Sequence, residues 1–551
     1  MRILLLCDGG GPIGVGHVMR SLALAEASVA AGHTVVVAGH FEGAFVRGQL
    51  ALAPVEVIQL AALKADDDLQ PVINLVRTLR PDVIHVDSYE APGPLGELVV
   101  SPGVKPGFGI LALGGQTIGN VVLSNMEDGS FGRRPADVVI DPTFGAELSP
   151  RPDDGSTVLL RGSRYTPIRQ RVLDARKSGE ADVAHDGIAH DAAARSVLVV
   201  MGGTDPVGLA PVTVKLLADT GLELDVTVIA VGEIAERVRA AASGSHLSLS
   251  VLAPVDDLAA LMVRQDLVVS AAGTSVGELC CVGVPMALVW AVGNQREGYD
   301  RVVAAGAAVG LGGPELGRDE LGRDDPSLDE PSPIEAAVGL LRNALTDSRA
   351  REDLALAGRQ VVDGLGAWRV VRTWEMTKRS VPAVVDPGRL VARAATLEDA
   401  RLLWEWRNDP ATRASSRSAE EVPWDDHLVW LGDSLNRTDR LLLLVEDEAV
   451  PVGTVRWDLA RDREGEREWE VSITVAPQRR RQSLARPLLR AGEVALSEAT
   501  RSSATGVTAY LAVVNVDNDA SLRLFETSAY VPDAPPDHRG FMRFRKAAPV
   551  A

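Results

Sequence analysis

The stretch that decides the fold opens the chain: Ile3-Leu-Leu-Leu-Cys7, then Asp8-Gly-Gly-Gly-Pro-Ile-Gly14-Val-Gly16-His17-Val-Met-Arg20. An unbroken apolar run that ends in glycines is typical of a strand buried on both faces, and the apolar spacing after His17 indicates a helix. Glycines in such a turn let the backbone approach a ligand closely, and the helix start offers free N–H groups to an anion. The stretch therefore predicts the first strand, turn and helix of an α/β fold.

Working outward, short apolar runs alternate with amphipathic stretches over the first 170 residues. This alternation predicts a parallel sheet with helices on both faces. Helices are expected at 18–31 and 69–79, and strands at 3–7, 34–38, 55–58, 83–86, 110–113 and 138–140.

The same pattern restarts after a polar stretch at 178–195, which we expect to be a linker or surface loop. Two helices separated by glycines are expected over 354–379, and an exposed loop at 319–333. The predicted domains are 1–177 and 193–380, two Rossmann-type units whose ligands bind beyond the strand C-termini. Strands of the second domain are expected at 197–201, 224–231, 247–252, 267–270 and 287–290.

A proline- and glycine-containing break at 381–389 precedes a change of character to tryptophan- and arginine-rich sequence. We expect a separate α+β domain over 390–548. Its antiparallel strands are predicted at 441–446, 452–458, 469–475 and 508–514.

Composition limits the partners. The formal net charge of −19 argues against nucleic acid, because phosphate binding favours a basic surface. The three cysteines have no metal-ligand spacing and fit a reducing compartment. No stretch approaches the roughly 20 apolar residues that span a bilayer. We therefore expect a cytoplasmic protein without membrane insertion and without a metal site; no pattern indicates its oligomeric state.

His17 is the first candidate catalytic residue. It falls where a strand ends and a helix begins, and a histidine there can serve as a general base. The alternative is a histidine that only hydrogen-bonds the turn.

Two turns of the second domain have ligand-binding character. Gly202-Gly203-Thr204-Asp205 follows a strand, and Gly273-Thr274-Ser275-Val-Gly277-Glu278 leads into a helix. The second turn can present amides and hydroxyls to a diphosphate, and Glu278 can accept hydrogen bonds from ribose hydroxyls.

Together these motifs resemble the GT-B-fold UDP-sugar hydrolases of pseudaminic acid synthesis and the related spore-coat polysaccharide proteins. The resemblance covers about the first 380 residues. It extends to Val86-Asp87-Ser88-Tyr89, to 162–169, to Asn294-Gln295 and to 363–367. One departure is the stretch 114–125, ahead of Glu127-Asp128, which we interpret as an insertion.

The resemblance implies that water attacks the anomeric carbon of a UDP-linked amino sugar, that His17 is the general base, and that no metal is required. An alternative is a GT-B glycosyltransferase that passes the sugar to an acceptor alcohol. The implied substrate and UDP ligands are Gly14, Gly16, Arg20, Tyr89, Gly203, Thr204, Gly273, Thr274, Ser275, Glu278 and Asn294.

In the last domain, Val475-Ala-Pro-Gln-Arg-Arg480-Arg-Gln-Ser-Leu-Ala485 follows a predicted strand and opens a helix. It resembles the pyrophosphate loop of GNAT acetyltransferases, with Ser483 in place of a glycine; the alternative is a solvated surface turn. The resemblance implies acetyl-CoA as co-substrate, held by Val475, Arg480, Arg481, Gln482, Ser483, Leu484, Ala485 and Asn518.

Other segments bear on catalysis. Residues 404–410 resemble the substrate side of acetyltransferases, and 515–526 resembles the closing segment of the family. Phe525 stands where the family often carries a tyrosine acid, and Ala529 replaces a glycine, so a non-catalytic GNAT-like domain is an alternative. Glu470 is a candidate base for the amine, or simply a charge at a strand edge. Fusion of the two activities implies that a UDP-4-amino sugar is acetylated and its product then hydrolysed.

Overall fold

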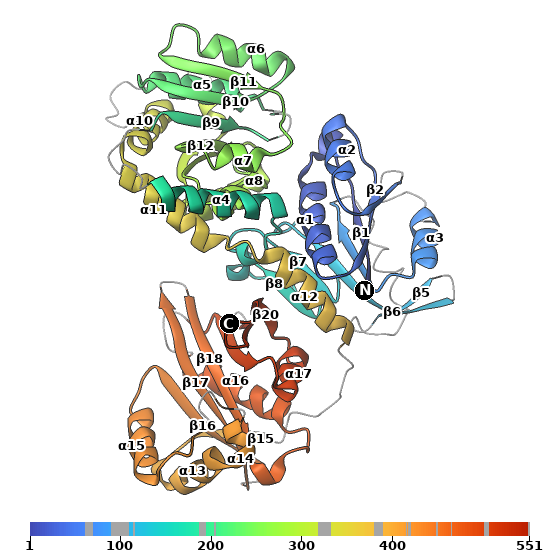
Figure 1. Cartoon of the computed structure of the whole chain (residues 1–551), viewed down its shortest axis with the longest axis vertical. Helices are drawn as coiled ribbons and strands as arrows, with labels where there is room; N and C mark the ends of the chain where they lie inside the picture. Colours follow the sequence, from blue (N-terminus) through green and yellow to red (C-terminus); the bar gives the residue numbers. More distant parts are fainter. Residues whose placement is uncertain are drawn as a thin grey trace. The chain divides into compact units, whose positions relative to one another are not determined.

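The computed structural model describes residues 1–60, 70–89, 109–113, 116–186, 194–202, 205, 207–317, 332–379, 390–414, 416, 420–447, 450–463, 466–500 and 506–548. The chain forms two compact units, Met1–Lys378 and Arg379–Ala551, whose elements are labelled in Figure 1. The predicted break at 381–389 and nearly all of the predicted loop at 319–333 lie outside the described residues.

The first unit begins with a sheet of strand order β3-β2-β1-β4-β6-β7-β8, in which all neighbours are parallel. Its central strand, β1, is fully buried from Ile3 to Cys7, as its continuous apolar run predicts. The strands are β1 (Arg2–Cys7), β2 (Thr34–Gly39), β3 (Glu56–Gln59), β4 (Val83–Asp87), β6 (Gln116–Met126), β7 (Val138–Asp141) and β8 (Val158–Arg161). The helices of this part are α1 (Gly16–Ala30), α2 (Ala44–Ala51) and α3 (Gln70–Leu79).

The interpretation of 114–125 as an insertion stays a prediction, but its described part is not a loop. Most of it is β6, which lies beside β4 with Val122 opposite Val83, inside the sheet. The neighbouring strand β5 (Gly109–Leu113) pairs with β6 antiparallel and lies off the main order. Polar residues and Gly119 make up most of the first half of β6, so the short buried run at Val121 and Val122 gives a weak strand pattern.

The second sheet has the order β11-β10-β9-β12-β13-β14 and is also parallel throughout. Its strands are β9 (Ser196–Val200), β10 (Leu224–Ile229), β11 (Leu247–Leu252), β12 (Leu267–Ala271), β13 (Met286–Val289) and β14 (Val309–Gly312). Its helices are α5 (Leu209–Asp219), α6 (Gly232–Ala241), α7 (Leu258–Met262), α8 (Ser275–Val282), α9 (Gly293–Ala304), α10 (Pro333–Thr346) and α11 (Ser348–Val361).

The expected linker at 178–195 is helical over 178–186, so the prediction is wrong for that part. Helix α4 (Gln170–Asp186) runs through its first half, and its buried Val172 and Ala175 join the core of the second sheet. At Gly179 the helix passes so near Val263 that a β-carbon there would meet the valine side chain. Composition misled the prediction because alanine, glutamate and lysine form helices as readily as they form loops.

In both sheets the direction in which successive strands are added reverses at an equivalent place. The chain runs outward from β1 to β3 and then returns to β4 on the other side of β1, and it repeats this from β9 to β12. Loops beyond the carboxyl ends of the strands diverge at such a point, which is where parallel α/β sheets bind ligands. The turns after β1, β4 and β12 therefore lie at the two favoured binding positions.

Helix α12 (Gly366–Arg379) returns to the first sheet after the second sheet is complete, and Figure 1 shows it beside β7 and β8. Its Trp374 is fully buried and donates from Nε1 to Ser124 Oγ on β6, at 2.9 Å. Glu375 accepts from His33 Nε2 at 2.8 Å. The last helix of the first unit thus anchors on the sheet with which the chain began.

The second unit is a sheet of order β15-β16-β17-β18-β19-β21-β20. All pairs are antiparallel except β18 with β19, which are parallel, so the expectation of antiparallel strands is wrong at this one pair. The strands are β15 (Leu390–Ala394), β16 (Arg440–Asp447), β17 (Val450–Arg463), β18 (Glu466–Val475), β19 (Ala509–Asn515), β20 (Val531–Ala534) and β21 (Phe541–Ala547). Its helices are α13 (Ala400–Asn408), α14 (Pro410–Ala414), α15 (Trp424–Leu435), α16 (Ala485–Thr500) and α17 (Asp519–Thr527).

Helices cover both faces of this sheet. On one face, Leu403, Trp406 and Leu431 of α13 and α15 form a cluster with Leu442 and Leu444 of β16. On the other, Trp457 of β17 donates from Nε1 to the carbonyl of Gly492 on α16, at 3.1 Å. Across the described parts of both units, no helix is long and apolar enough to cross a membrane.

Candidate active sites of the two units

His17 lies in the first turn of α1 and is 4% exposed. Its Nδ1 is 2.6 Å from Oδ1 of Asp87, the last residue of β4. A separation this short between a ring nitrogen and a carboxylate oxygen requires a proton between them, so we assign that proton to Nδ1, which donates to Asp87. In the neutral imidazole with this tautomer, Nε2 carries the lone pair. A buried carboxylate that holds the imidazole in this tautomer is the arrangement of a histidine base.

Arg20, one helical turn after His17, joins two carboxylates. It donates from Nε to Oδ2 of Asp87 at 2.6 Å, and from Nη1 to the two oxygens of Asp128 at 2.7 and 2.9 Å. Its Nη2 donates to Oδ1 of Asp87, also at 2.6 Å. The guanidinium is thus engaged by protein carboxylates, and the geometry gives Arg20 a part in positioning them; its predicted contact with substrate stays a prediction.

Charge keeps Asp87 ionised. Burial alone would raise its pKa, but Arg20 and His17 together bring the pKa of this carboxyl well below its usual range. A carboxylate that remains charged in the interior can stabilise an imidazolium when His17 takes a proton.

Tyr89 and Asp128 flank the histidine. The Tyr89 ring stands edge-on to the His17 ring with centroids 4.5 Å apart, and its hydroxyl donates to Asp128. Burial and the neighbouring Asp128 raise the pKa of the tyrosine, so its hydroxyl stays protonated. Tyr89 is 42% exposed, so this edge of the site is open to a ligand.

The Gly273–Ser275 turn of the second sheet meets the His17 turn. Thr274 precedes α8, and a β-carbon on Gly16 would lie 3.0 Å from Thr274 Cγ2. Glycine at position 16 therefore permits the helix start that carries His17 to approach the helix start that carries Ser275. The N-termini of two helices thus lie close together, and N–H groups at helix N-termini favour an anion such as a diphosphate.

One further residue of the predicted set lies on α8, and Arg169 from the segment 162–169 acts on it electrostatically. Glu278 is in the first turn of this helix, where burial raises the pKa of the carboxyl although Arg169 and Arg171 oppose the shift. Arg169 itself is 4% exposed and donates from Nε to Glu26 of α1 at 2.6 Å, which joins α1 to the segment before α4.

The remaining predicted ligands of the first unit are partly described. Gly14 has a φ of +79°, a conformation that favours glycine, and its carbonyl accepts from Gly10 N at 2.7 Å. Asn294 lies in the first turn of α9, though its side chain is outside the described part. Gly203 and Thr204 also lie outside the described residues, and the adjacent Asp205 caps α5 by accepting from the amides of Leu209 and Ala210 at 2.8 Å.

In the second unit, the predicted cofactor loop joins the end of β18, Val475, to the start of α16, Ala485. Arg481 and Ser483 have φ values of +63° and +58°. The backbone at Ser483 thus keeps the left-handed conformation for which a glycine is expected. Within the described residues, the amides of the four residues from Arg481 to Leu484 donate to no protein acceptor, so this loop and the helix start can receive a diphosphate.

Two of the predicted cofactor ligands are engaged elsewhere. The Arg480 guanidinium lies 2.7 Å from Asp409 and donates to Thr412 Oγ1 at 2.6 Å, which ties the loop to α14. The Asn518 side chain accepts from the amide of Ser521 at 3.1 Å and caps α17. Their contact with the cofactor stays a prediction, and the loop amides are the groups free to make one.

Strands β18 and β19 pair only as far as Val471 and Ala512 and then separate. Glu470 is one residue before this parting and faces Asp458 on β17. Phe525, which replaces the expected tyrosine, is 4% exposed and packs against Tyr530 with ring centroids 5.0 Å apart. The Tyr530 hydroxyl donates to buried Glu493 at 2.9 Å, so it does not replace the missing acid.

Reasoning from the sequence missed the partners of His17. Asp87 and Asp128 appeared there only as members of motifs, with no assigned role. The available signal was an aspartate at the end of a buried apolar run, because parallel strands end at the same edge of a sheet. Among the described residues no group of three or more His, Cys, Asp and Glu side chains could hold a metal ion.

Three proteins resemble the chain over most of its length. The uncharacterized protein MJ1062 of Methanocaldococcus jannaschii is 19% identical over 467 residues, which cover 83% of this chain and 83% of that one. This matched length exceeds the length of the first unit, Met1–Lys378. The spore coat polysaccharide biosynthesis protein SpsG of Bacillus subtilis is 23% identical over 376 residues, covering 67% of this chain and 96% of its own. The crystal structure of Acinetobacter baumannii MurG is 18% identical with a TM-score of 0.45, covering 68% of this chain and 99% of its own.

A family match covers the second unit. Residues 389–530 match the model described as the acetyltransferase (GNAT) domain. The match includes β18, the loop after it and the start of α16, and it ends at Tyr530. The chain therefore consists of an α/β unit with two parallel sheets, distantly similar to SpsG, followed by a GNAT acetyltransferase domain.

Proposed function

We propose that the chain is a bifunctional enzyme of nonulosonic acid synthesis, in which the first unit releases UDP from a UDP-linked amino sugar by hydrolysis and the GNAT domain acetylates the precursor of that sugar. The observation that carries the hydrolase is the Asp87–His17 pair beside the Gly273–Ser275 turn. The distant similarity to a spore coat polysaccharide biosynthesis protein supports a role in polysaccharide synthesis.

In the hydrolytic step, Nε2 of His17 takes a proton from water as the oxygen of that water bonds to the anomeric carbon. The bond between that carbon and the β-phosphate oxygen breaks, and UDP leaves with inversion at the carbon. The helix starts at Gly16 and Ser275 offer N–H groups to the negative charge of the leaving diphosphate. Asp87 stabilises the imidazolium that results.

In the acetyl-transfer step, an amine attacks the acetyl carbon, the C–N bond forms and the C–S bond breaks. Glu470 takes the amine proton, directly or through a water molecule, and the coenzyme leaves as a thiolate that is protonated by solvent. The amides of the loop from Arg481 to Ala485 hold the coenzyme diphosphate, and acetyl-CoA supplies the acetyl group. The parting of β18 and β19 next to Glu470 supports this placement.

We assign UDP-4-amino-4,6-dideoxy-N-acetyl-β-L-altrosamine as the acetyl acceptor and UDP-2,4-diacetamido-2,4,6-trideoxy-β-L-altropyranose as the hydrolase substrate. The two reactions are then consecutive on one chain in the cytoplasm, where acetyl-CoA is available. Domains at 1–177, 193–380 and 390–548 are the units of this proposal.

The test is to incubate the purified chain with the UDP-4-amino sugar, with and without acetyl-CoA, and to follow the products by mass spectrometry. Free diacetamido sugar and UDP that form only with acetyl-CoA support both activities and their order. An intact UDP-sugar in both incubations overturns the assigned substrate.

Two outcomes point to the alternatives. UDP release that requires an added acceptor alcohol indicates a glycosyltransferase. Acetyl-CoA binding without turnover of any amino sugar indicates a non-catalytic GNAT domain, the reading that Phe525 favours because its ring cannot donate a proton.

A further inference from the structure

A row of charged residues crosses three adjacent strands of the GNAT sheet. Arg440 on β16 is the register partner of Asp458 on β17, which is the register partner of Glu470 on β18. Residues directly opposite on neighbouring strands share a face of the sheet, and so does Arg456, two positions before Asp458. Trp457 between them bonds to α16, so the charged row lies on the face away from that helix.

One carboxylate holds both arginines of the row. Arg440 donates from Nε to one oxygen of Asp458, and Arg456 donates from Nε to the other at 2.8 Å. Nη1 of Arg440 also donates to Ser434 Oγ at 2.8 Å. Among the described residues, the terminal nitrogens of Arg456 bond to no protein group, and its side chain is 33% exposed. Arg456 is thus fixed by its inner nitrogen and presents its outer N–H groups to a ligand, the geometry that suits a phosphate.

The row ends where acetyl transfer is expected. Glu470 is one residue before the last pair that joins β18 to β19, and the gap between these strands opens from there toward the loop at 481–485. Adjacent strands lie about 4.8 Å apart, so two steps from β18 to β16 span about 10 Å. Arg456 and Arg440 are therefore within the length of one small molecule from Glu470.

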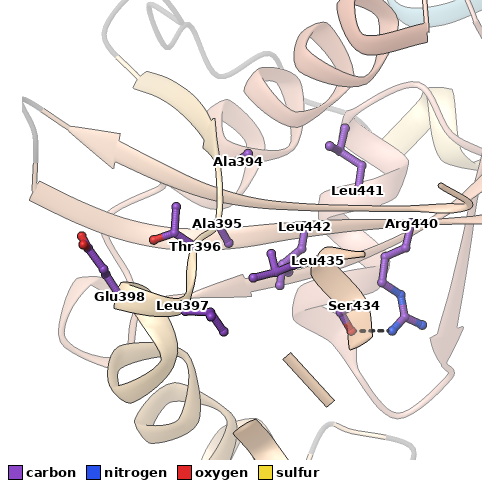
Figure 2. Close-up of a pocket in the computed structure, with 10 residues that line it drawn as sticks. All are labelled: Ala394, Ala395, Thr396, Leu397, Glu398, Ser434, Leu435, Arg440, Leu441 and Leu442. Carbon is purple, nitrogen blue, oxygen red and sulfur yellow. Dashed lines mark hydrogen bonds between the residues drawn. The ribbon is translucent and has the colours of Figure 1, made fainter. Parts of the chain in front are cut away.

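A pocket of about 610 Å³ adjoins the Arg440 end of the row. Figure 2 shows its lining, with Arg440 directed toward Ser434 at one side and Glu398 at the other. Small-molecule sites commonly measure roughly 300–1,000 Å³, so the pocket has room for part of an acceptor. Apolar side chains of Leu397, Leu435 and Leu442 make up much of its wall.

We propose that the face carrying Arg440, Arg456 and Glu470 is the acetyl-acceptor site, and that it takes an amine whose molecule also carries a phosphate group. The amine lies at Glu470, the phosphate at Arg456, and the remainder of the acceptor reaches the pocket beside Arg440. Asp458 positions the two arginines. This inference rests on acetyl transfer by the GNAT domain and adds a rule for its acceptor: a nucleotide-linked amino sugar binds better than the same sugar without its nucleotide.

The experiment compares Arg456→Gln with the wild-type chain in initial rates of coenzyme A release, at saturating acetyl-CoA. The two acceptors are UDP-4-amino-4,6-dideoxy-N-acetyl-β-L-altrosamine and the same amino sugar freed from UDP. A charge-assisted contact to phosphate is worth about tenfold or more in binding. The expected result is a KM at least tenfold higher for the UDP-linked acceptor, with the KM values for the free sugar and for acetyl-CoA changed less than twofold.

Two further variants make the result specific. Arg490 is an exposed residue of α16, at the other face of the sheet. Arg490→Gln removes the same charge and should leave all three KM values unchanged. Arg456→Lys keeps a positive charge and should recover part of the affinity for the UDP-linked acceptor. Equal KM changes for both acceptors, or none, overturn the acceptor site while leaving acetyl transfer intact. If the wild-type chain releases no coenzyme A with either acceptor, the proposed acetyl transfer fails, and the acceptor site with it.

Discussion

The carboxylate of Asp87, at the end of β4, lies 2.6 Å from Nδ1 of His17, in the first turn of α1. Residues 70 positions apart in the sequence meet because β1 and β4 are neighbours in the sheet. If this pair forms the general base, Asp87→Asn keeps the shape of the site but removes the charge that stabilises the imidazolium. We expect kcat for UDP release to fall by roughly 10²–10⁴-fold, with a smaller change in KM. Steady-state UDP release checks this expectation.

His17→Ala should reduce the same rate at least as much, because it removes the base itself. The matched control is His246→Ala, a histidine exposed in the turn between α6 and β11, for which we expect an unchanged rate. UDP release at the wild-type rate in His17→Ala would show that this pair is not the base.

Arg20 bridges Asp87 and Asp128, and a lysine cannot reproduce the two-sided geometry of its guanidinium. In Arg20→Lys the charge remains, but one carboxylate loses its partner. We expect kcat for UDP release to fall about 10–100-fold with a smaller change in KM, because Asp87 and Asp128 are no longer both held in position beside His17. Steady-state UDP release measures both constants. A rise in KM at an unchanged kcat would mean that Arg20 binds substrate and does not position the carboxylates.

His85, on β4, predicts a pH dependence of stability. It is fully buried, its Nδ1 lies 3.0 Å from Ser124 Oγ, and burial lowers its pKa to about 4. The unfolded chain binds a proton at this residue below about pH 6.5, whereas the folded chain stays neutral until about pH 4. The free energy of unfolding should therefore fall on acidification across this window, by about 3 kcal/mol at most.

The variant His85→Gln should lose that dependence while its overall stability is lower, since it keeps a polar group beside Ser124 but cannot titrate. Calorimetric transitions of the first unit between pH 7.5 and 4 compare the two chains. The depressed pKa of Asp87 does not interfere, because the stability from that carboxylate is complete above its ordinary pKa of about 3.9 and is lost only below it. If the stability of the two chains falls in parallel as the pH is lowered, His85 is not the cause of the pH dependence.

The sequence is sufficient to predict the strands, helices and turns that follow from hydrophobic periodicity. The buried run at Ile3 to Cys7, the helix start at His17 and the turn at Gly273–Ser275 all lie as expected. Strands β8 and β14 were not expected, because each has four residues, is only partly buried and has no clear alternation. Composition alone does not separate a polar helix from a loop, so it predicts a linker where residues 178–186 form a helix.

The contacts of the candidate site could not be read in the same way. Asp87 meets His17 only through strand order, which depends on the whole sheet, and neither residue signals the other locally. Arg20 was expected to contact the substrate, yet the structure engages it with two carboxylates from β4 and the turn after β6. A side chain with several donors can bind either a ligand or a neighbouring protein group, and tertiary packing determines which of the two it binds.

Two residues of the GNAT domain adopt left-handed conformations where the resemblance implies glycine: Ser483 with φ +58° and Ala529 with φ +63°. A β-carbon in this region of backbone space costs on the order of 1 kcal/mol or more. We expect Ser483→Gly and Ala529→Gly each to raise the stability of the domain by about 1 kcal/mol, which is the relieved strain less the greater entropy of glycine in the unfolded chain. Calorimetry of the second transition measures this.

The two variants should differ in their effect on the cofactor. Ser483 lies in the loop whose amides are free, so Ser483→Gly should also lower the Kd for acetyl-CoA, by about two- to fivefold, because the loop then reaches the binding conformation without strain. Ala529 follows Ser528, the C-cap residue of α17, in a turn where Tyr530 N donates to Phe525 O at 3.0 Å. Its replacement should change stability alone. Ala491→Gly, inside α16, is the control and should destabilise by roughly 1 kcal/mol. Titration calorimetry measures the Kd for acetyl-CoA in both chains. An equal Kd in the wild type and in Ser483→Gly would indicate that the coenzyme diphosphate does not bind at this loop.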